Sequence, residues 1–120
     1  MSSAPVPVDI KLLTQSKILV FKYQDGTEFE FSFEFLRVHS PSAEVKGHGP
    51  DDGELQVGKE QVQIISIEPV GNYALKLIFS DGHDSGLYSW QYFYELGQHR
   101  DQLWEHYLSA LAKEGYERSP

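Results

Sequence analysis

The sequence predicts an α+β domain in which an antiparallel β-meander of hairpins is followed by two C-terminal helices. Before Ser89, apolar and polar residues alternate with a period of two in several runs. The hairpin signals Asp25-Gly26 and Asp81-Gly82 follow such runs. After Ser89 the apolar spacing changes to that of an amphipathic helix. Strands followed by helices are the element order of an α+β domain.

The first strands are expected between residue 8 and residue 33. An alternating run from Val8 to Leu12 precedes a more fully apolar run at Ile18–Tyr23. Beyond Asp25-Gly26, phenylalanine alternates with acidic or hydroxyl residues. This spacing puts the rings of Phe29, Phe31 and Phe33 on one face, where we expect core residues rather than an aromatic platform for a ligand.

A helical turn is expected at Phe35–Val38, before a long irregular stretch at Ser40–Glu60. This stretch contains two prolines and four glycines. Loops of about twenty residues are uncommon in compact domains and are usually either functional or disordered. The sequence leaves both alternatives open, and it does not decide whether residues 47–58 are ordered.

Strand character returns at Val62–Ile67, and Gly71-Asn72 marks the next turn. A further strand then presents one apolar face, and a short strand is expected at Gly86–Tyr88. The residues expected to share the apolar face are Tyr73, Leu75, Leu77 and Phe79.

Two helices are expected after the last strand. Ser89 is a suitable N-cap for a short helix that begins at Trp90 and ends at Gly97. A second helix is expected to stop at Gly115. Its apolar positions are Leu103, Trp104, Tyr107, Leu108 and Leu111. The predicted organisation is therefore a flexible arm (1–7), one domain (8–115) and a tail (116–120).

Composition excludes several classes of function. Ten basic and eighteen acidic residues give a net charge of −8, which opposes binding to nucleic acid and to anionic membranes. The absence of cysteine excludes disulfides, thiolate nucleophiles and cysteine-ligated metal sites. No signal peptide and no apolar run near ~20 residues are found, so we expect a soluble cytoplasmic protein. It is expected to be a monomer or a weak homodimer.

No catalytic constellation stands out, and we do not expect an enzyme. The chain has no G-x-S-x-G motif and no phosphate-binding glycine loop. His99-Arg100-Asp101 has the H-x-D form of a non-haem iron site, but the next histidine is His106. On a helix these histidines would lie about 10.5 Å apart along the axis, too far to share one ion. We interpret them as polar helix surface.

Three histidines fall in expected loops, where they are candidate metal ligands. They are His39, His48 and His83. Imidazole, assisted by nearby carboxylates, suits zinc or iron. Their spacing matches no compact metal motif, and hydrogen-bonded turn residues are the simpler alternative. The residues themselves therefore make no cofactor certain.

Two segments nevertheless resemble a known family. They are Leu36-Arg37 onward to Gly49, and Asp81-Gly82-His83 followed by Tyr88-Ser89-Trp90. Over roughly Ile10 to Leu111 the chain resembles the N-terminal domain of gamma-butyrobetaine hydroxylase-like proteins, in its small stand-alone bacterial form. In the large hydroxylases this domain is similar to a zinc-binding accessory module, whose metal is held by three cysteines and by the histidine of an Asp-Gly-His turn.

Placed on this chain, the resemblance implies that His83 is the one retained ligand. The cysteine positions fall on Ser40, Ser42 and Val45, so the thiolates are absent. His39 and His48 lie close to these positions as candidate replacements.

The oxygen-activating iron of the hydroxylases belongs to a separate domain that this chain lacks, and similar domains are attached to ATPases of the iron–sulfur cluster carrier type. The resemblance thus implies a non-catalytic accessory or protein-binding module, linked to iron–sulfur cluster or oxygenase metabolism. The alternative is a weak zinc- or iron-binding protein that uses the loop histidines. Candidate residues of the interaction surface are Arg37, Asp81, Gly82, His83, Tyr88 and Trp90.

Overall fold

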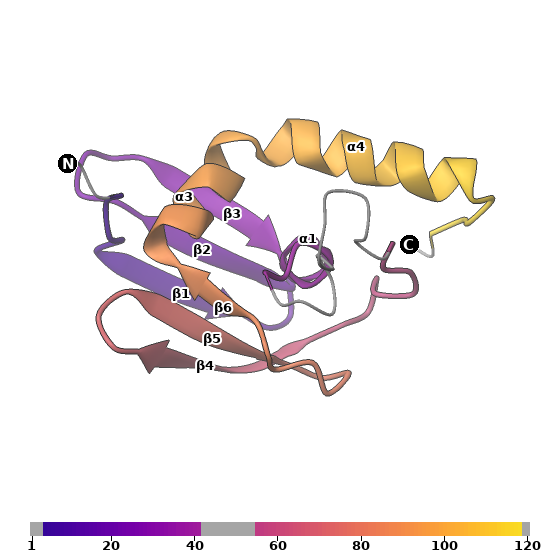
Figure 1. Cartoon of the computed structure of the whole chain (residues 1–120). Helices are drawn as coiled ribbons and strands as arrows, with labels where there is room; N and C mark the ends of the chain where they lie inside the picture. Colours follow the sequence, from indigo (N-terminus) through magenta and orange to yellow (C-terminus); the bar gives the residue numbers. More distant parts are fainter. Residues whose placement is uncertain (1–3, 42–54, 119–120) are drawn as a thin grey trace.

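A computed structural model describes residues 4–41 and 55–118 of the chain. It contains two three-stranded antiparallel sheets, followed by helices, which confirms the expected α+β fold (Figure 1). The elements in chain order are β1 (Asp9–Leu13), β2 (Ile18–Lys22), β3 (Glu28–Ser32), α1 (Phe33–Val38), β4 (Ile64–Val70), β5 (Ala74–Phe79), β6 (Leu87–Ser89), α3 (Trp90–Gln98) and α4 (Arg100–Lys113).

The first sheet has the strand order β1-β2-β3, and its β2–β3 turn lies at the predicted hairpin signal, Asp25-Gly26. Gly26 adopts a φ of 92° in the β2–β3 turn, and Asp25 Oδ1 accepts a hydrogen bond from the Thr27 N–H at 2.9 Å. At the end of β3 the Ser32 hydroxyl accepts from the Phe35 N–H at 3.0 Å. This cap starts α1 directly after the strand, so Phe33 is a buried helical residue rather than part of β3.

The second sheet has the order β4-β5-β6, with a register shift between Ile64 and Ser66. Leu75, Leu77 and Phe79 are buried, as the alternating pattern predicts. Tyr73 is not on that face: it precedes β5, and the residue is 56% exposed. The turn at Gly71, with a φ of 56°, reverses the chain immediately before Tyr73 and removes it from the strand.

The two C-terminal helices are confirmed, but the residue expected to separate them is not a stop. Ser89 caps α3, accepting a hydrogen bond from the Tyr92 N–H at 3.0 Å. Helix α3 continues through Gly97, where an added Cβ would lie 2.3 Å from the Phe29 ring. Gly97 is therefore a contact residue between α3 and β3. Gly115, with a φ of 73°, follows α4 as predicted.

Both sheets and α3 share one hydrophobic core, and α3 crosses in front of the strands in Figure 1. The ring of Phe93 lies at its centre, with centroids 4.5 Å from Phe21, 6.1 Å from Phe31 and 5.2 Å from Tyr88. A smaller cluster under α4 contains Val38, Tyr107 and Leu111. Within the described residues, no helix is long and apolar enough to span a bilayer.

Candidate functional site

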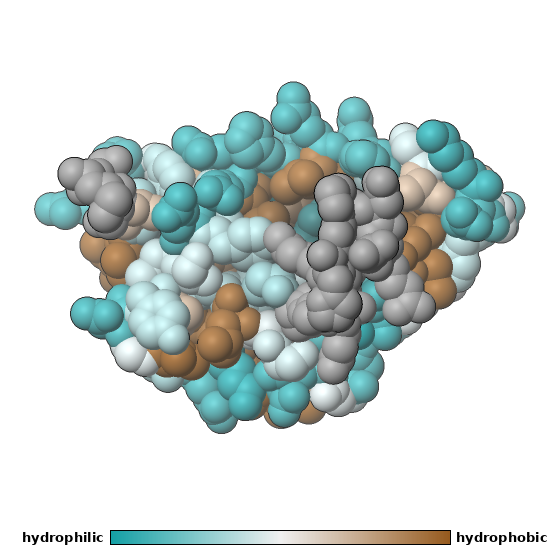
Figure 2. All heavy atoms as spheres, in the orientation of Figure 1, coloured by the Kyte–Doolittle hydropathy of each residue, from teal (hydrophilic) through white to brown (hydrophobic). Residues whose placement is uncertain are grey.

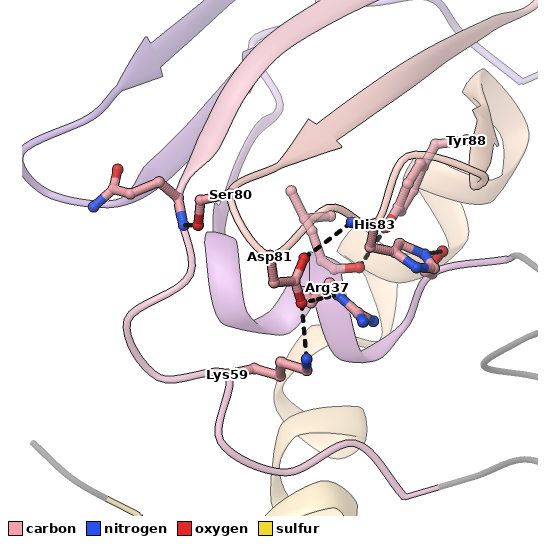
Figure 3. A network of polar contacts seen from close by, with 9 residues as sticks. Arg37, Lys59, Ser80, Asp81, His83 and Tyr88 are labelled. Carbon is pink, nitrogen blue, oxygen red and sulfur yellow. Dashed lines mark hydrogen bonds and ion pairs between the residues drawn. The ribbon is translucent and has the colours of Figure 1, made fainter.

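The Asp81–His83 turn leaves β5 in a tightly bonded loop (Figure 3). Gly82 has a φ of 87°, which favours glycine, and its N–H donates to the Phe79 carbonyl at 3.1 Å. Asp81 Oδ1 accepts from the His83 N–H at 3.2 Å. The Phe79 N–H donates in turn to the His83 carbonyl at 3.0 Å. These bonds fix the direction in which the Asp81 and His83 side chains point.

The carboxylate of Asp81 joins three segments that are distant in sequence. Its Oδ2 accepts from Arg37 Nε at 2.9 Å and from Lys59 Nζ at 2.8 Å. Burial alone would raise the pKa of this carboxyl, but hydrogen bonds from Lys59, the His83 N–H and Arg37 outweigh burial and lower the pKa to about 2. Asp81 is therefore ionised at neutral pH, and it connects α1, the residues before β4 and the turn.

His83 is buried, and its imidazole is hydrogen-bonded to Ser40, two residues after the end of α1. Its Nε2 lies 2.8 Å from Ser40 Oγ, and only 7% of the residue is exposed, whereas Ser40 is fully buried. A Cβ added at Gly86 would approach Ser40 Oγ to 2.3 Å. The glycine thus allows the chain before β6 to pass closely over this Ser–His pair.

Two tyrosine hydroxyls, one from β6 and one from α3, donate hydrogen bonds to backbone carbonyls at the C-terminal end of α1. Tyr88 donates to the Leu36 carbonyl at 2.5 Å, and Tyr92 donates to the His39 carbonyl at 2.5 Å. Burial raises the pKa of Tyr88 well above its usual value. Burial, with a smaller effect of the Glu95 charge, raises the pKa of Tyr92 to about 12. Both hydroxyls are neutral donors, and they supply hydrogen bonds to carbonyl groups at this helix end, where the helix itself offers no donor.

The candidate metal ligands are not gathered into one centre in the described structure. His39 Nδ1 lies 2.9 Å from the Phe35 carbonyl, while His83 pairs with Ser40. His48, Ser42 and Val45 lie outside the described residues. Across residues 4–41 and 55–118, no three histidine, cysteine or acidic residues are placed so that they could hold a metal ion.

A separate hollow of about 440 Å³ lies where the β4–β5 turn meets the start of α3. In Figure 1 both lie on the same side of the molecule as the N-terminal segment. Trp90 is held there, because its Nε1 donates to the Asn72 carbonyl at 3.0 Å and its N–H donates to the Tyr73 carbonyl at 3.1 Å. The lining residues are Ala4, Val6, Asn72, Tyr73, Ser89, Trp90 and Gln91.

The sequence of this chain matches a known protein family. The model described as gamma-butyrobetaine hydroxylase-like, N-terminal, matches residues 10–94. The chain belongs to this family.

Solved structures are similar to this gamma-butyrobetaine hydroxylase-like domain along most of its length. One NMR solution structure is 50% identical with a TM-score of 0.83, covering 98% of this chain and 93% of its own. A second NMR structure is 46% identical with a TM-score of 0.83, covering 100% and 89%. A crystal structure of a DUF971-family protein of unknown function from Acidithiobacillus ferrooxidans is 35% identical with a TM-score of 0.64, covering 76% and 91%. No curated protein matches.

In this gamma-butyrobetaine hydroxylase-like domain, a hydrogen bond joins two positions that the resemblance assigns to the zinc site of the large hydroxylases. The resemblance places a zinc-binding cysteine of the large hydroxylases at Ser40 and their histidine ligand at His83. The structure brings these two side chains to 2.8 Å. A serine hydroxyl and an imidazole thus satisfy each other where the resemblance implies a thiolate and an imidazole.

The predicted interaction surface needs correction. Arg37, His83 and Tyr88 are 7%, 7% and 0% exposed, so they support the turn from inside and do not form a surface. Their burial follows from bonds to residues far away in the chain, which local patterns do not reveal. Asp81 and Gly82 lie at the exposed turn, and Trp90 is half-buried in the hollow. Tyr73, which lines the hollow with Trp90, was not among the predicted surface residues, although its place at a turn tip was a usable signal.

Proposed function

We propose that this domain is a non-catalytic module that binds a protein partner through the hollow between Tyr73 and Trp90. The observation that carries this proposal is a pair of aromatic residues that line one hollow: the exposed Tyr73, and Trp90, whose indole is held by its bond to the Asn72 carbonyl. Tyrosine and tryptophan are enriched among the residues that contribute most to protein interfaces. A ring that is already immobilised loses little conformational freedom on binding, so more of its contact energy is retained.

The bonding at the Asp81–His83 turn supports a non-catalytic role. A general base or nucleophile must reach the substrate, but His83 is buried against Ser40, and the Asp81 carboxylate is paired with Arg37 and Lys59. On the face displayed in Figure 2, apolar groups occur as separate patches among hydrophilic side chains. This surface suits a small docking site of a few anchors rather than an extended apolar interface.

The resemblance supplies the proposed class of partner. It links similar domains to hydroxylases and to ATPases of the iron–sulfur cluster carrier type. We therefore propose a partner from iron–sulfur cluster or oxygenase metabolism. The net charge of −8 favours a partner with a basic rim around its contact surface.

The test compares three immobilised proteins: the wild type, Tyr73→Ala and a matched control, Leu87→Ala. Leu87 is also exposed, at 44%, but it does not line the hollow. A soluble extract of the native organism is passed over each protein, and the retained proteins are quantified by mass spectrometry. A partner should be retained by the wild type and the control and lost with Tyr73→Ala. With the purified partner, the loss of affinity should be about 2 kcal/mol, or roughly thirtyfold.

Two outcomes count against the proposal. Equal retention of partner by all three proteins would show that the hollow is not the docking surface. No retention above the empty resin would remove the binding function itself.

The second candidate function is weak metal binding that uses His83 with His39 or His48. The proximity of His83 to Ser40 favours it, because the resemblance places two zinc ligands of the large hydroxylases at these positions and the retained ligand, His83, is in place. Zinc, and ferrous iron without oxygen, can be titrated while the imidazole signals of His39, His48 and His83 are followed by NMR. Saturable shifts that disappear in His83→Ala would support this candidate. If none of these signals moves up to millimolar metal, the candidate is rejected.

A further inference from the structure

A second polar cluster on α1, one helical turn before Arg37, contains a buried carboxylate. Glu34 is only 6% exposed. Its Oε2 accepts a hydrogen bond from Arg118 Nε at 2.9 Å, and its Oε1 accepts from Arg118 Nη2. Among the described residues, Arg118 is the one side chain that donates to this carboxylate. Because an ionised carboxylate is costly to bury alone, a cation at this position stabilises the ionised form.

The geometry around Glu34 selects a guanidinium rather than an ammonium. Two parallel bonds from one planar group match the two oxygens of a carboxylate. The Arg118 guanidinium also lies over the Trp104 ring, 5.1 Å from its centroid. A lysine ammonium is a point charge and cannot make the fork and the ring contact in the same way.

Arg118 reaches Glu34 from the segment that follows α4. The chain leaves α4 at Gly115, in the left-handed region, and then places two side chains on two acids. The Tyr116 hydroxyl donates to the Glu60 carboxylate at 3.0 and 3.1 Å, and Arg118 binds Glu34 two residues later. The Arg118 side chain remains 33% exposed, whereas that of Glu34 is 6% exposed. The acid is thus the fixed part of the pair, and the arginine is the accessible part.

We propose that Glu34 and Trp104 form a guanidinium-binding site that accepts an arginine side chain from a partner protein when Arg118 is displaced. Arg118 is the internal occupant, and its Tyr-x-Arg spacing indicates the kind of segment that fits. The acidic character of Glu34, Glu60 and the whole chain favours such a basic segment. This site lies outside the Tyr73–Trp90 hollow and does not depend on it. A tethered Arg118 competes at high effective concentration, so its removal should strengthen binding from outside.

The first test uses the full chain with Arg118→Ala and the synthetic peptide EGYERSP, which copies residues 114–120. Binding is followed through the Trp104 indole signal by NMR. The peptide should give saturable shifts with this variant and bind at least roughly tenfold more weakly to the wild type. A peptide with lysine in place of arginine should also bind roughly tenfold more weakly. The double variant Glu34→Gln, Arg118→Ala should not bind.

A second test remains informative if the Arg118→Ala chain is unstable. Millimolar methylguanidinium should raise the melting temperature of that variant, and methylammonium should not. If Arg118→Ala does not fold at all, Arg118→Lys keeps a cation at Glu34, and the arginine peptide should displace it.

Three results would overturn the site. They are equal binding of the arginine and lysine peptides, binding that Glu34→Gln leaves unchanged, and no response to peptide or methylguanidinium. A wild-type dimer that disappears in Arg118→Ala would show exchange of the segment between two copies, and would overturn the assignment to a partner protein.

Discussion

The carboxylate of Asp81 compensates a cation that has little other support. Arg37 is 7% exposed, and its Nη1 is buried with no hydrogen-bond partner in the described part of the chain. The ion pair to Asp81, at 2.9 Å, is the contact that balances its charge. Removing one member of a buried pair leaves the other charge uncompensated, which usually destabilises more than the pair itself stabilises.

Asp81→Asn should lower the free energy of unfolding by about 2 kcal/mol. This is below the ~3–5 kcal/mol of fully buried pairs, because a quarter of the Asp81 side chain is exposed. Urea unfolding at pH 7 measures the change. Asp84→Asn is the matched control, since Asp84 directly follows the turn and is exposed, and it should change stability by less than about 0.5 kcal/mol.

The same variant should remove part of the acid sensitivity of the fold. The folded pKa of Asp81, about 2, lies below the ~3.9 of an unfolded aspartate. Its stabilising contribution is therefore complete above pH ~4 and is lost as the pH falls toward 2. Urea midpoints measured between pH 6 and pH 2 should show the wild type approaching Asp81→Asn over this window. A gap that stays constant would show that the carboxylate charge is not coupled to folding.

The pairing of Ser40 with His83 shows what the sequence could establish at this scale. The resemblance placed both residues at one site although 43 positions separate them. Periodicity and turn signals act over a few residues and cannot predict such a contact. They also cannot show that His83 is buried, since a histidine in a turn is equally compatible with an exposed side chain.

At the scale of elements, local patterns predicted the strands, the Ser89 cap and the stop at Gly115. These features depend on alternation, a side-chain hydroxyl and a positive φ, all of which are properties of nearby residues. Gly97 was predicted wrongly, because its role is set by a ring on β3 rather than by its neighbours in sequence. The pair of Glu34 and Arg118 was missed for the same reason, with 84 positions between them.

Gly97→Ala should therefore destabilise the protein although alanine is the better helix former. The gain in helix propensity is about 1 kcal/mol, but the new Cβ would lie 2.3 Å from the Phe29 ring. Overpacking of this kind costs about 1–3 kcal/mol, and a contact this short belongs at the upper end. We expect a net loss of about 1–2 kcal/mol in thermal or urea unfolding.

A double variant separates the contact from the helix. Phe29→Leu removes the ring that the new methyl group meets, so Gly97→Ala should cost less in that background than in the wild type. Ser109→Ala, at an exposed position of α4, should be neutral or slightly stabilising. Additive effects of Phe29→Leu and Gly97→Ala would contradict the proposed contact.

At the scale of the whole molecule, one core connects elements from both halves of the chain. Phe93 on α3 contacts Phe21 and Phe31 of the first sheet and Tyr88 of the second. The two proposed interaction sites lie on elements that pack around this shared core: the hollow is at the start of α3, and Glu34 is on α1. Their positions relative to one another therefore depend on the two sheets folding as one unit.

Phe93→Ala should weaken both sheets together. Truncating a fully buried phenylalanine costs about 3–5 kcal/mol, which is a large part of the 5–15 kcal/mol typical of such domains. Far- and near-ultraviolet circular dichroism should report one coincident transition at lower denaturant in the variant. Amide hydrogen exchange should accelerate in β2 and in β6 to a similar extent, because each strand places a ring against Phe93. Faster exchange in only one sheet would show that the sheets are separate cooperative units, and the two sites could then move independently.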